Sequence, residues 1–222
     1  MTIVKICGIK TLTEALAAVE AGADYLGFNF FPKSVRFIEF HNFAAIASAM
    51  KKEKPSVKLV GVFVNSSAAD IGSLLKTGAL DLVQLHGDES PVFCAAFGDK
   101  VFKAYRGVPM TGAKSYIRKE APALLLDANV TGAYGGMGLT ADWLAAAGLA
   151  KHYPILLAGG LNPENVTEAV KQVNPWGVDV ASGVESSPGR KDIGKMRAFV
   201  QAVRSIRHLA AQGINSGEYL DK

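Results

Sequence analysis

The sequence is poor in cysteine and histidine, which removes several classes of protein from consideration. Among its 222 residues are two cysteines, Cys7 and Cys94, and four histidines. Two distant cysteines form neither a disulfide framework nor the paired spacing of a zinc site. The sequence also contains no P-loop, no H-E-x-x-H and no G-x-S-x-G pattern. Nothing in it demands a metal ion or an organic cofactor.

Long apolar runs and blocks of like charge are missing as well. No run approaches the roughly 20 apolar residues of a membrane-spanning helix, and no signal-peptide pattern follows Met1. The basic residues are scattered, which argues against a nucleic-acid-binding surface. With 49% hydrophobic residues and a net charge of +4, the chain can form a core and suits an anionic small substrate. We therefore expect a cytoplasmic protein that binds neither nucleic acid nor membrane.

Strand-like and helix-like segments alternate along the whole chain. Local signals predict helix starts at the capping box Thr11–Glu14, at Ser90-Pro91, at Asn162-Pro163 and at Asp192. The helix expected after Gly107 has the weakest pattern. The strand-like segments are residues 4–8, 24–30, 58–64, 81–86, 101–105, 123–127, 154–158 and 177–182.

Eight strand-then-helix units without a linker between them predict a closed (β/α)₈ barrel, the TIM-barrel class. An open dinucleotide-binding sheet is disfavoured because no G-x-G-x-x-G follows the first strand. We expect a single domain over residues 1–209. Residues 210–222, where the helical pattern fades, are expected to form a frayed or extended tail.

The first strand combines a lysine and a thiol on one face. Side chains alternate along a strand, so Lys5 and Cys7 share the face opposite Val4 and Ile6. A buried lysine requires an acidic partner, and Asp179, on the neighbouring last strand, is the natural candidate. Such a lysine would favour the thiolate of Cys7. The alternative is that Cys7 is simply a small core residue.

In a barrel of this kind, reactive groups lie where the strands end and the next loops begin. The predicted ends carry Cys7, Asn29, Asn65, His86, Tyr105, Asp127, the pair Gly159-Gly160 and the pair Ser182-Gly183. Glycine loops after the last two strands are typical of a phosphate site, although tight turns alone would also use glycine. Cys7 and Asp127 are the only thiol and carboxylate at these ends. They could exchange protons with a substrate between them, or Asp127 could pair with a lysine or cap a loop.

Two further side chains are candidates for substrate binding. Arg36, in the loop after the second strand, could bind a carboxylate through its planar fork, or it could be a solvated loop charge. His86 could line the mouth of the barrel or hydrogen-bond to a neighbour of the substrate.

Several segments, in order, resemble the phosphoribosylanthranilate isomerase family. They are Lys5–Ile9, Gly61–Asn65, Gln84–Gly87, Leu126-Asp127, Ala158–Val166, Gly177–Glu185 and Pro188–Asp192. The resemblance runs from the first strand into the last helix. It implies a cofactor-free (β/α)₈ isomerase of tryptophan biosynthesis that is monomeric or dimeric.

The resemblance also assigns roles to residues. It implies an Amadori rearrangement of N-(5′-phosphoribosyl)anthranilate to 1-(2-carboxyphenylamino)-1-deoxyribulose 5-phosphate, with Cys7 as general base and Asp127 as general acid. Arg36 would hold the anthranilate carboxylate, and Asp179 would border the substrate. We expect His86 to bind substrate as well, and Gly159, Gly160, Ser182 and Gly183 to bind its phosphate. A monomer is favoured over a dimer because no long exposed apolar loop is evident.

This chain departs from the family pattern at four positions, Val35, Phe37, Met137 and Ala181. Met137 replaces a threonine of the loop after the sixth strand, which bears on substrate affinity more than on the reaction. Rival hypotheses are another phosphate-binding barrel isomerase and a barrel that binds a phosphosugar without turning it over. Related barrel enzymes would require a catalytic lysine, metal-binding histidines or a second aspartate in place of Cys7, and these patterns do not appear.

Overall fold

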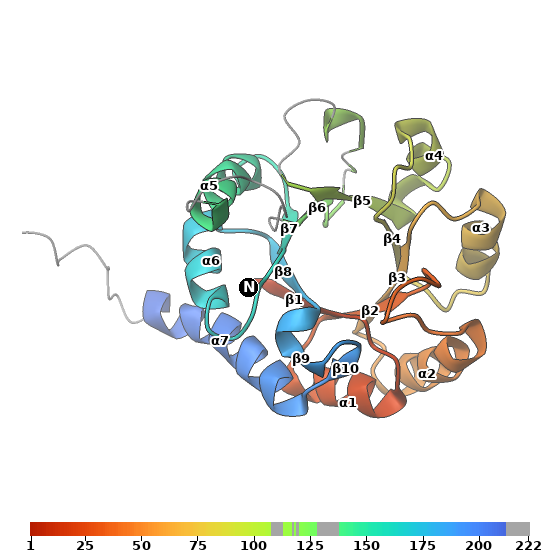
Figure 1. Ribbon diagram of the computed structural model, residues 1–222, viewed down its shortest axis with the longest axis horizontal. Coiled ribbons are helices and arrows are strands. Elements are labelled where there is room, and N and C mark those ends of the chain that lie inside the picture. The colour runs from red at the N-terminus through yellow and green to blue at the C-terminus, as the bar shows by residue number, and fades with distance from the viewer. Residues whose placement is uncertain (108–112, 117, 119, 128–137, 212–222) are drawn as a thin grey trace, which may run out of the picture.

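The computed structural model describes residues 1–107, 113–116, 118, 120–127 and 138–211. Eight parallel strands pair in sequence order and close into a barrel, with helices around the outside (Figure 1). The predicted (β/α)₈ barrel is therefore confirmed. The strands are β1 (Ile3–Cys7), β2 (Tyr25–Asn29), β3 (Lys58–Phe63), β4 (Leu82–Leu85), β5 (Val101–Arg106), β6 (Leu124–Asp127), β7 (Ile155–Ala158) and β8 (Gly177–Val180).

Three of the four predicted helix starts, at Thr11, Ser90 and Asp192, are confirmed by α1, α4 and α7. Thr11 and Glu14 form the predicted capping box, and the Ser90 side chain accepts the N–H of Phe93. The α-helices are α1 (Leu12–Ala21), α2 (Phe40–Glu53), α3 (Ala68–Lys76), α4 (Pro91–Ala95), α5 (Gly138–Ala150), α6 (Val166–Val173) and α7 (Ile193–Ala211). Short 3₁₀ turns are η1 (Gly98–Lys100), η2 (Ala113–Tyr116) and η3 (Ser182–Val184).

Three local predictions need correction. Asn162-Pro163 does not open α6; the Asn162 side chain instead accepts the N–H groups of Glu164 and Asn165 in a turn before the helix. In the described part of the connection after Gly107, the chain forms the turn η2 rather than an α-helix. The last strand ends at Val180, and Ser182 begins η3.

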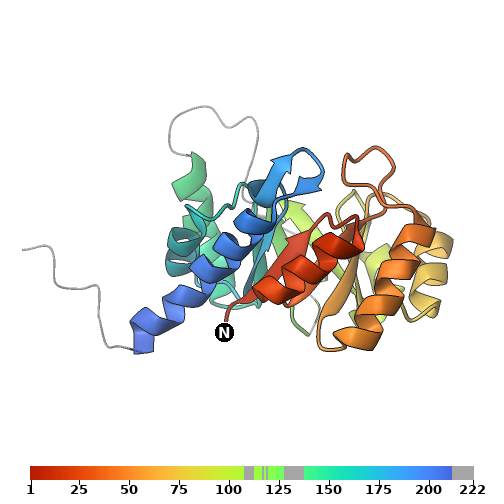
Figure 2. The same cartoon turned by 90° about the horizontal axis from the view of Figure 1, so that it is seen from below.

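A small hairpin after η3 has no counterpart among the predicted elements. It consists of β9 (Glu185–Ser187) and β10 (Arg190–Lys191), paired antiparallel. Figure 2 shows the hairpin at the end of the barrel opposite the N-terminus, on the side where the loop between β2 and α2 also rises. The hairpin is anchored to the start of α1, because Glu14 Oε1 accepts the N–H of Lys191 at 3.1 Å.

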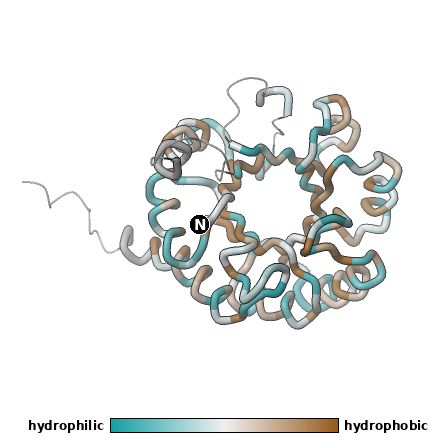
Figure 3. The backbone as a smooth tube through the Cα atoms, viewed as in Figure 1, coloured by the Kyte–Doolittle hydropathy of each residue, from teal (hydrophilic) through white to brown (hydrophobic). Residues whose placement is uncertain are grey.

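The apolar side chains form two layers. Outward-facing strand residues such as Val4 and Ile6 pack against the helices, and a smaller cluster around Phe102 and Leu125 fills the barrel. Figure 3 shows hydrophobic colour along the ring of strands and hydrophilic colour on the outer turns of the helices. Of the described helices, none combines the length and apolar character needed to cross a membrane. Helix α7 continues to Ala211, two residues into the expected tail, and residues 212–222 lie outside the described residues.

A buried ion pair connects the ends of β4 and β5. Glu89 accepts Lys103 Nζ at 2.9 Å, and both side chains are almost fully buried. The same carboxylate accepts the N–H groups of Asn65 and Gly87 at 2.8 and 2.9 Å. One carboxylate therefore connects the loops after β3 and β4 to strand β5.

Glu89→Ala is expected to lower the free energy of unfolding by about 3–5 kcal/mol, because it leaves Lys103 as an unpaired buried charge. The control is Lys51→Ala, which removes a half-exposed partner from Asp81 and should cost less than about 1 kcal/mol. Urea unfolding of both variants measures the difference. Similar losses in the two variants would contradict the importance of the buried pair.

Candidate active site

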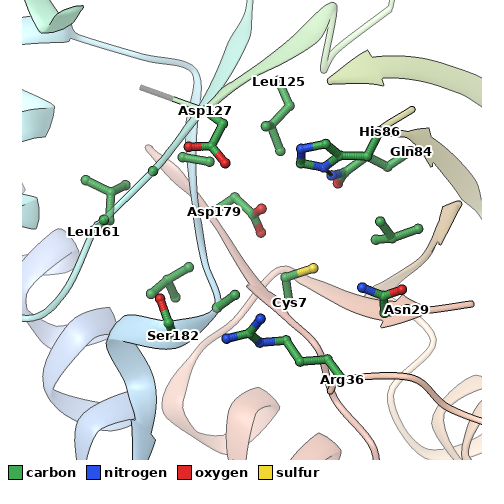
Figure 4. Close-up of a pocket in the computed structure, with 16 residues that line it drawn as sticks. Cys7, Asn29, Arg36, Gln84, His86, Leu125, Asp127, Leu161, Asp179 and Ser182 are labelled. Carbon is green, nitrogen blue, oxygen red and sulfur yellow. Dashed lines mark hydrogen bonds between the residues drawn. The ribbon is translucent and has the colours of Figure 1, made fainter. Parts of the chain in front are cut away.

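A cavity of about 300 Å³ opens at the carboxyl ends of the strands. It contains the predicted site residues Cys7, Arg36, His86, Asp127, Gly159, Gly160, Asp179 and Ser182, together with Asn29, Gln84 and several apolar side chains. Figure 4 shows Cys7 and Asp127 reaching the cavity from different strands, with Asp179 between them in this view. Gly183 is the one predicted residue that does not line this cavity.

Cys7 is the last residue of β1 and is buried. Its neighbour across the β1–β2 pairing is Gly27, where an added Cβ would lie 2.7 Å from Cys7 Sγ. The space for the sulfur therefore depends on a glycine in the adjacent strand. Sequence analysis did not identify Gly27, since a lone strand glycine carries no sign of the side chain it faces.

The buried partner predicted for Lys5 is present. Lys5 Nζ lies 2.8 Å from Asp179 Oδ1, and the lysine side chain is fully buried. Although burial opposes the charge, Asp179 and Cys7 raise the pKa of Lys5 above its ordinary value. Lys5 is thus a cation held in place by a carboxylate.

Lys5 favours the thiolate of Cys7, as expected, but burial of the sulfur outweighs this effect. Burial raises the pKa of the Cys7 thiol; Lys5 and Lys191 oppose the shift, and Asp179 adds to it. Because Asp179 is paired with Lys5, the lysine charge is largely balanced before it acts on the sulfur. Cys7 is therefore a protonated thiol at neutral pH.

Asp127 ends β6, half-buried at the cavity wall. Its backbone carbonyl accepts the N–H of Gly107 at 2.8 Å, which fixes the strand end beside β5. The carboxylate lies at the same cavity as Cys7, as the predicted proton exchange requires. Each of the two groups comes from a rigid strand end rather than from a flexible loop.

His86 follows β4 and is held by a residue that sequence analysis did not select. Gln84 Nε2 lies 3.1 Å from His86 Nδ1, and by donating to it leaves the ring proton on Nε2. Burial lowers the pKa of His86, so the ring is neutral at pH 7. The period-2 alternation of β4 was the signal that could have paired Gln84 with His86.

Arg36 is neither free nor fully solvated, because Glu185 in the new hairpin binds it. Arg36 Nε lies 2.7 Å from Glu185 Oε1, and Arg36 Nη2 lies 2.8 Å from Oε2. No local pattern in the sequence connects Arg36 to an acidic partner, so Glu185 was not predicted. Lys191, also missed, donates to Glu185 Oε1 at 2.9 Å.

The glycines after β7 and β8 differ in what they do. Gly159 and Gly160 line the cavity with φ angles of 95° and 65°, which glycine adopts without strain. Gly183 lies in η3 against the carbonyl of Leu161, where no side chain would fit. Gly183 therefore brings the turns after β7 and β8 together. Met137, one of the departures noted in the sequence, lies outside the described residues.

The barrel and its cavity define the class: an α/β-barrel enzyme with its site at the carboxyl ends of the strands. Comparisons with known proteins narrow the class. Residues 4–202 match the sequence profile of the family described as N-(5'phosphoribosyl)anthranilate (PRA) isomerase. The chain therefore belongs to the N-(5′-phosphoribosyl)anthranilate isomerase family and is an enzyme, as the sequence resemblance implied.

Two relatives with that name match this chain over almost their full lengths. The one from Geobacter metallireducens is 46% identical over 205 residues, which span 92% of this chain and 100% of the relative. The one from Myxococcus xanthus is 46% identical over 211 residues, spanning 91% and 96%.

Solved structures agree. Phosphoribosyl anthranilate isomerase from Thermotoga maritima superposes with a TM-score of 0.80 at 38% identity, covering 92% of this chain and 100% of its own. A phosphoribosyl anthranilate isomerase in complex with reduced 1-(o-carboxyphenylamino)-1-deoxyribulose 5-phosphate gives a TM-score of 0.75 at 33% identity, with the same coverage.

The raised pKa of Cys7 predicts its reactivity. Because only the thiolate attacks alkylating agents, iodoacetamide should modify Cys7 slowly at neutral pH and faster as the pH rises beyond 9.0, the ordinary value for the thiol. Mass spectrometry of timed digests follows Cys7 and Cys94 separately. An alkylation rate at Cys7 that is already maximal at neutral pH would show that the thiolate is present in the free site.

Proposed function

We propose that this chain converts N-(5′-phosphoribosyl)anthranilate to 1-(2-carboxyphenylamino)-1-deoxyribulose 5-phosphate, an Amadori rearrangement of tryptophan biosynthesis. Family membership supports the reaction. The observation that carries the assignment of roles is the placement of Cys7 and Asp127 at one cavity, on strand ends that lie well apart around the ring.

The rearrangement needs one proton donor and one proton acceptor. Asp127 donates a proton to the furanose oxygen as the ring opens, which produces a Schiff base. Because burial keeps Cys7 protonated in the free site, the thiol first passes its own proton to water. The Cys7 thiolate then removes the proton from C2′, and the resulting enol becomes the ketone as C1′ takes up a proton and the 2′-hydroxyl loses one.

The remaining cavity residues bind the substrate. Arg36 is the arginine of this cavity and is assigned the anthranilate carboxylate. Gly159, Gly160 and Ser182 line the cavity, and together with Gly183, which lies outside its wall, they provide the turns assigned to the phosphate, through backbone N–H groups. His86, a neutral ring with its proton on Nε2, borders the sugar between these two ends, as does Asp179.

The test uses freshly prepared phosphoribosylanthranilate and follows the loss of its fluorescence. We expect wild-type turnover and a loss on the order of 10²–10⁴-fold in kcat for both Cys7→Ser and Asp127→Asn. Cys94→Ser is the matched control, because it changes the other cysteine outside the cavity and should leave kcat unaltered.

A folded wild-type protein without turnover would refute the isomerase and favour a barrel that only binds a phosphosugar. Turnover that survives both substitutions would keep the reaction and reject Cys7 and Asp127 as its proton carriers.

We also propose that the chain is a cytoplasmic monomer. The large apolar side chains exposed among the described residues are dispersed over separate elements, as Leu12, Phe40, Val92 and Leu144 show. The Thermotoga maritima relative, in contrast, is described as dimeric. Light scattering after size-exclusion chromatography is expected to give the mass of one chain, and twice that mass would reject the monomer.

A further inference from the structure

We propose that Glu185 is a positioning residue for substrate binding: it fixes the Arg36 guanidinium so that one free edge faces the cavity and accepts the carboxylate of the substrate. This inference rests on the proposed function and adds to it a residue outside the cavity wall. Glu185 itself contacts no substrate atom and acts through Arg36.

The Glu185 carboxylate is the centre of a compact, buried cluster. Its side chain is 4% exposed. Oε1 accepts Arg36 Nε at 2.7 Å and Lys191 Nζ at 2.9 Å, whereas Oε2 accepts Arg36 Nη2 at 2.8 Å and the N–H of Gly189 at 3.2 Å. Burial opposes ionisation, but the hydrogen bonds from Arg36 and Lys191 hold the pKa of Glu185 below its ordinary value. The carboxylate is thus charged at neutral pH.

The fork leaves part of the guanidinium available. Arginine has five N–H donors in one plane, and Glu185 takes one from Nε and one from Nη2. Three donors remain, of which one on Nη1 and one on Nη2 point along the Nη1–Nη2 edge, and Nη1 has no hydrogen-bond partner among the described residues. Figure 4 shows the Arg36 guanidinium pointing into the space near Cys7 and Ser182. A second carboxylate fits this edge by the same bidentate geometry.

Packing restricts both the side chain and the backbone at Arg36. An added Cβ at Gly8 would be 2.6 Å from Arg36 Cδ. Gly189 lies against the carbonyl of Val35, the residue before Arg36. The hairpin that carries Glu185 is itself attached to Glu14 of α1. The Arg36 side chain is therefore ordered before the substrate binds, and less side-chain entropy is lost on binding.

A double-mutant cycle of Glu185→Gln and Arg36→Ala tests this role through kcat and KM. Glu185→Gln alone should raise KM about 10-fold to 100-fold, because a charge-assisted contact to the substrate loses its geometry. Its kcat should stay within about threefold of wild type, since carboxylate binding is shared by ground state and transition state. In the Arg36→Ala background, Glu185→Gln should change KM by less than about twofold, because the two residues act as one unit.

The control is Ser187→Ala, an exposed position of the same strand β9 that should leave both constants unchanged. If Glu185→Gln does not fold because Lys191 loses its partner, Glu185→Asp keeps the charge but shortens the reach to Arg36. That variant should show the same rise in KM, and thermal unfolding verifies that it is folded.

Two results would overturn the inference while leaving the isomerase intact. One is a Glu185→Gln effect of the same size with and without Arg36; the other is a loss confined to kcat. Absence of turnover in folded wild-type protein would instead refute the proposed function, and the role of Glu185 would fall with it.

Discussion

The ion pair between Lys5 and Asp179 is the constraint on which the site depends. It joins β1 to β8, where the first and last strands meet to close the barrel, and its atoms lie 2.8 Å apart. A fully buried ammonium without this carboxylate would cost several kcal/mol. The pairing register places Lys5 opposite Asp179, so closure of the barrel and the position of Cys7, two residues further along β1, are fixed together.

That closure also sets the chemistry of Cys7. A single lysine beside a thiol would stabilise the thiolate, but a lysine already neutralised by an aspartate does so far less. Burial of the sulfur then has the largest effect on the pKa of Cys7, and the thiol stays protonated in the free site. The cavity therefore becomes basic at the sulfur only when something else alters its surroundings.

The repeated strand-then-helix units predicted the barrel, and the alternation of side chains along the strands predicted several site residues. Period-2 alternation placed Lys5 and Cys7 on one face and led to Asp179, and the strand ends led to His86 and Asp127. The sequence did not predict Glu185 or Lys191. Their hairpin strands are three and two residues long, too short for a recognisable period. Arg36, the partner of Glu185, is 149 positions away in the sequence, and nothing local in the sequence connects the two residues.

Besides the Asp127 carboxylate, the described site contains two clusters of paired charges. Lys5 and Asp179 balance each other at the base of the cavity, whereas Arg36 and Lys191 around Glu185 leave one net positive charge at the rim. The proposed substrate carries two anionic groups. In the proposed binding mode, the carboxylate neutralises the rim, and the phosphate lies at the glycine turns, whose backbone N–H groups attract an anion as dipoles rather than as full charges. In that mode the orientation of the substrate follows from this unequal arrangement, because exchanging the two ends would place the phosphate at the rim arginine and the aryl carboxylate at the glycine turns.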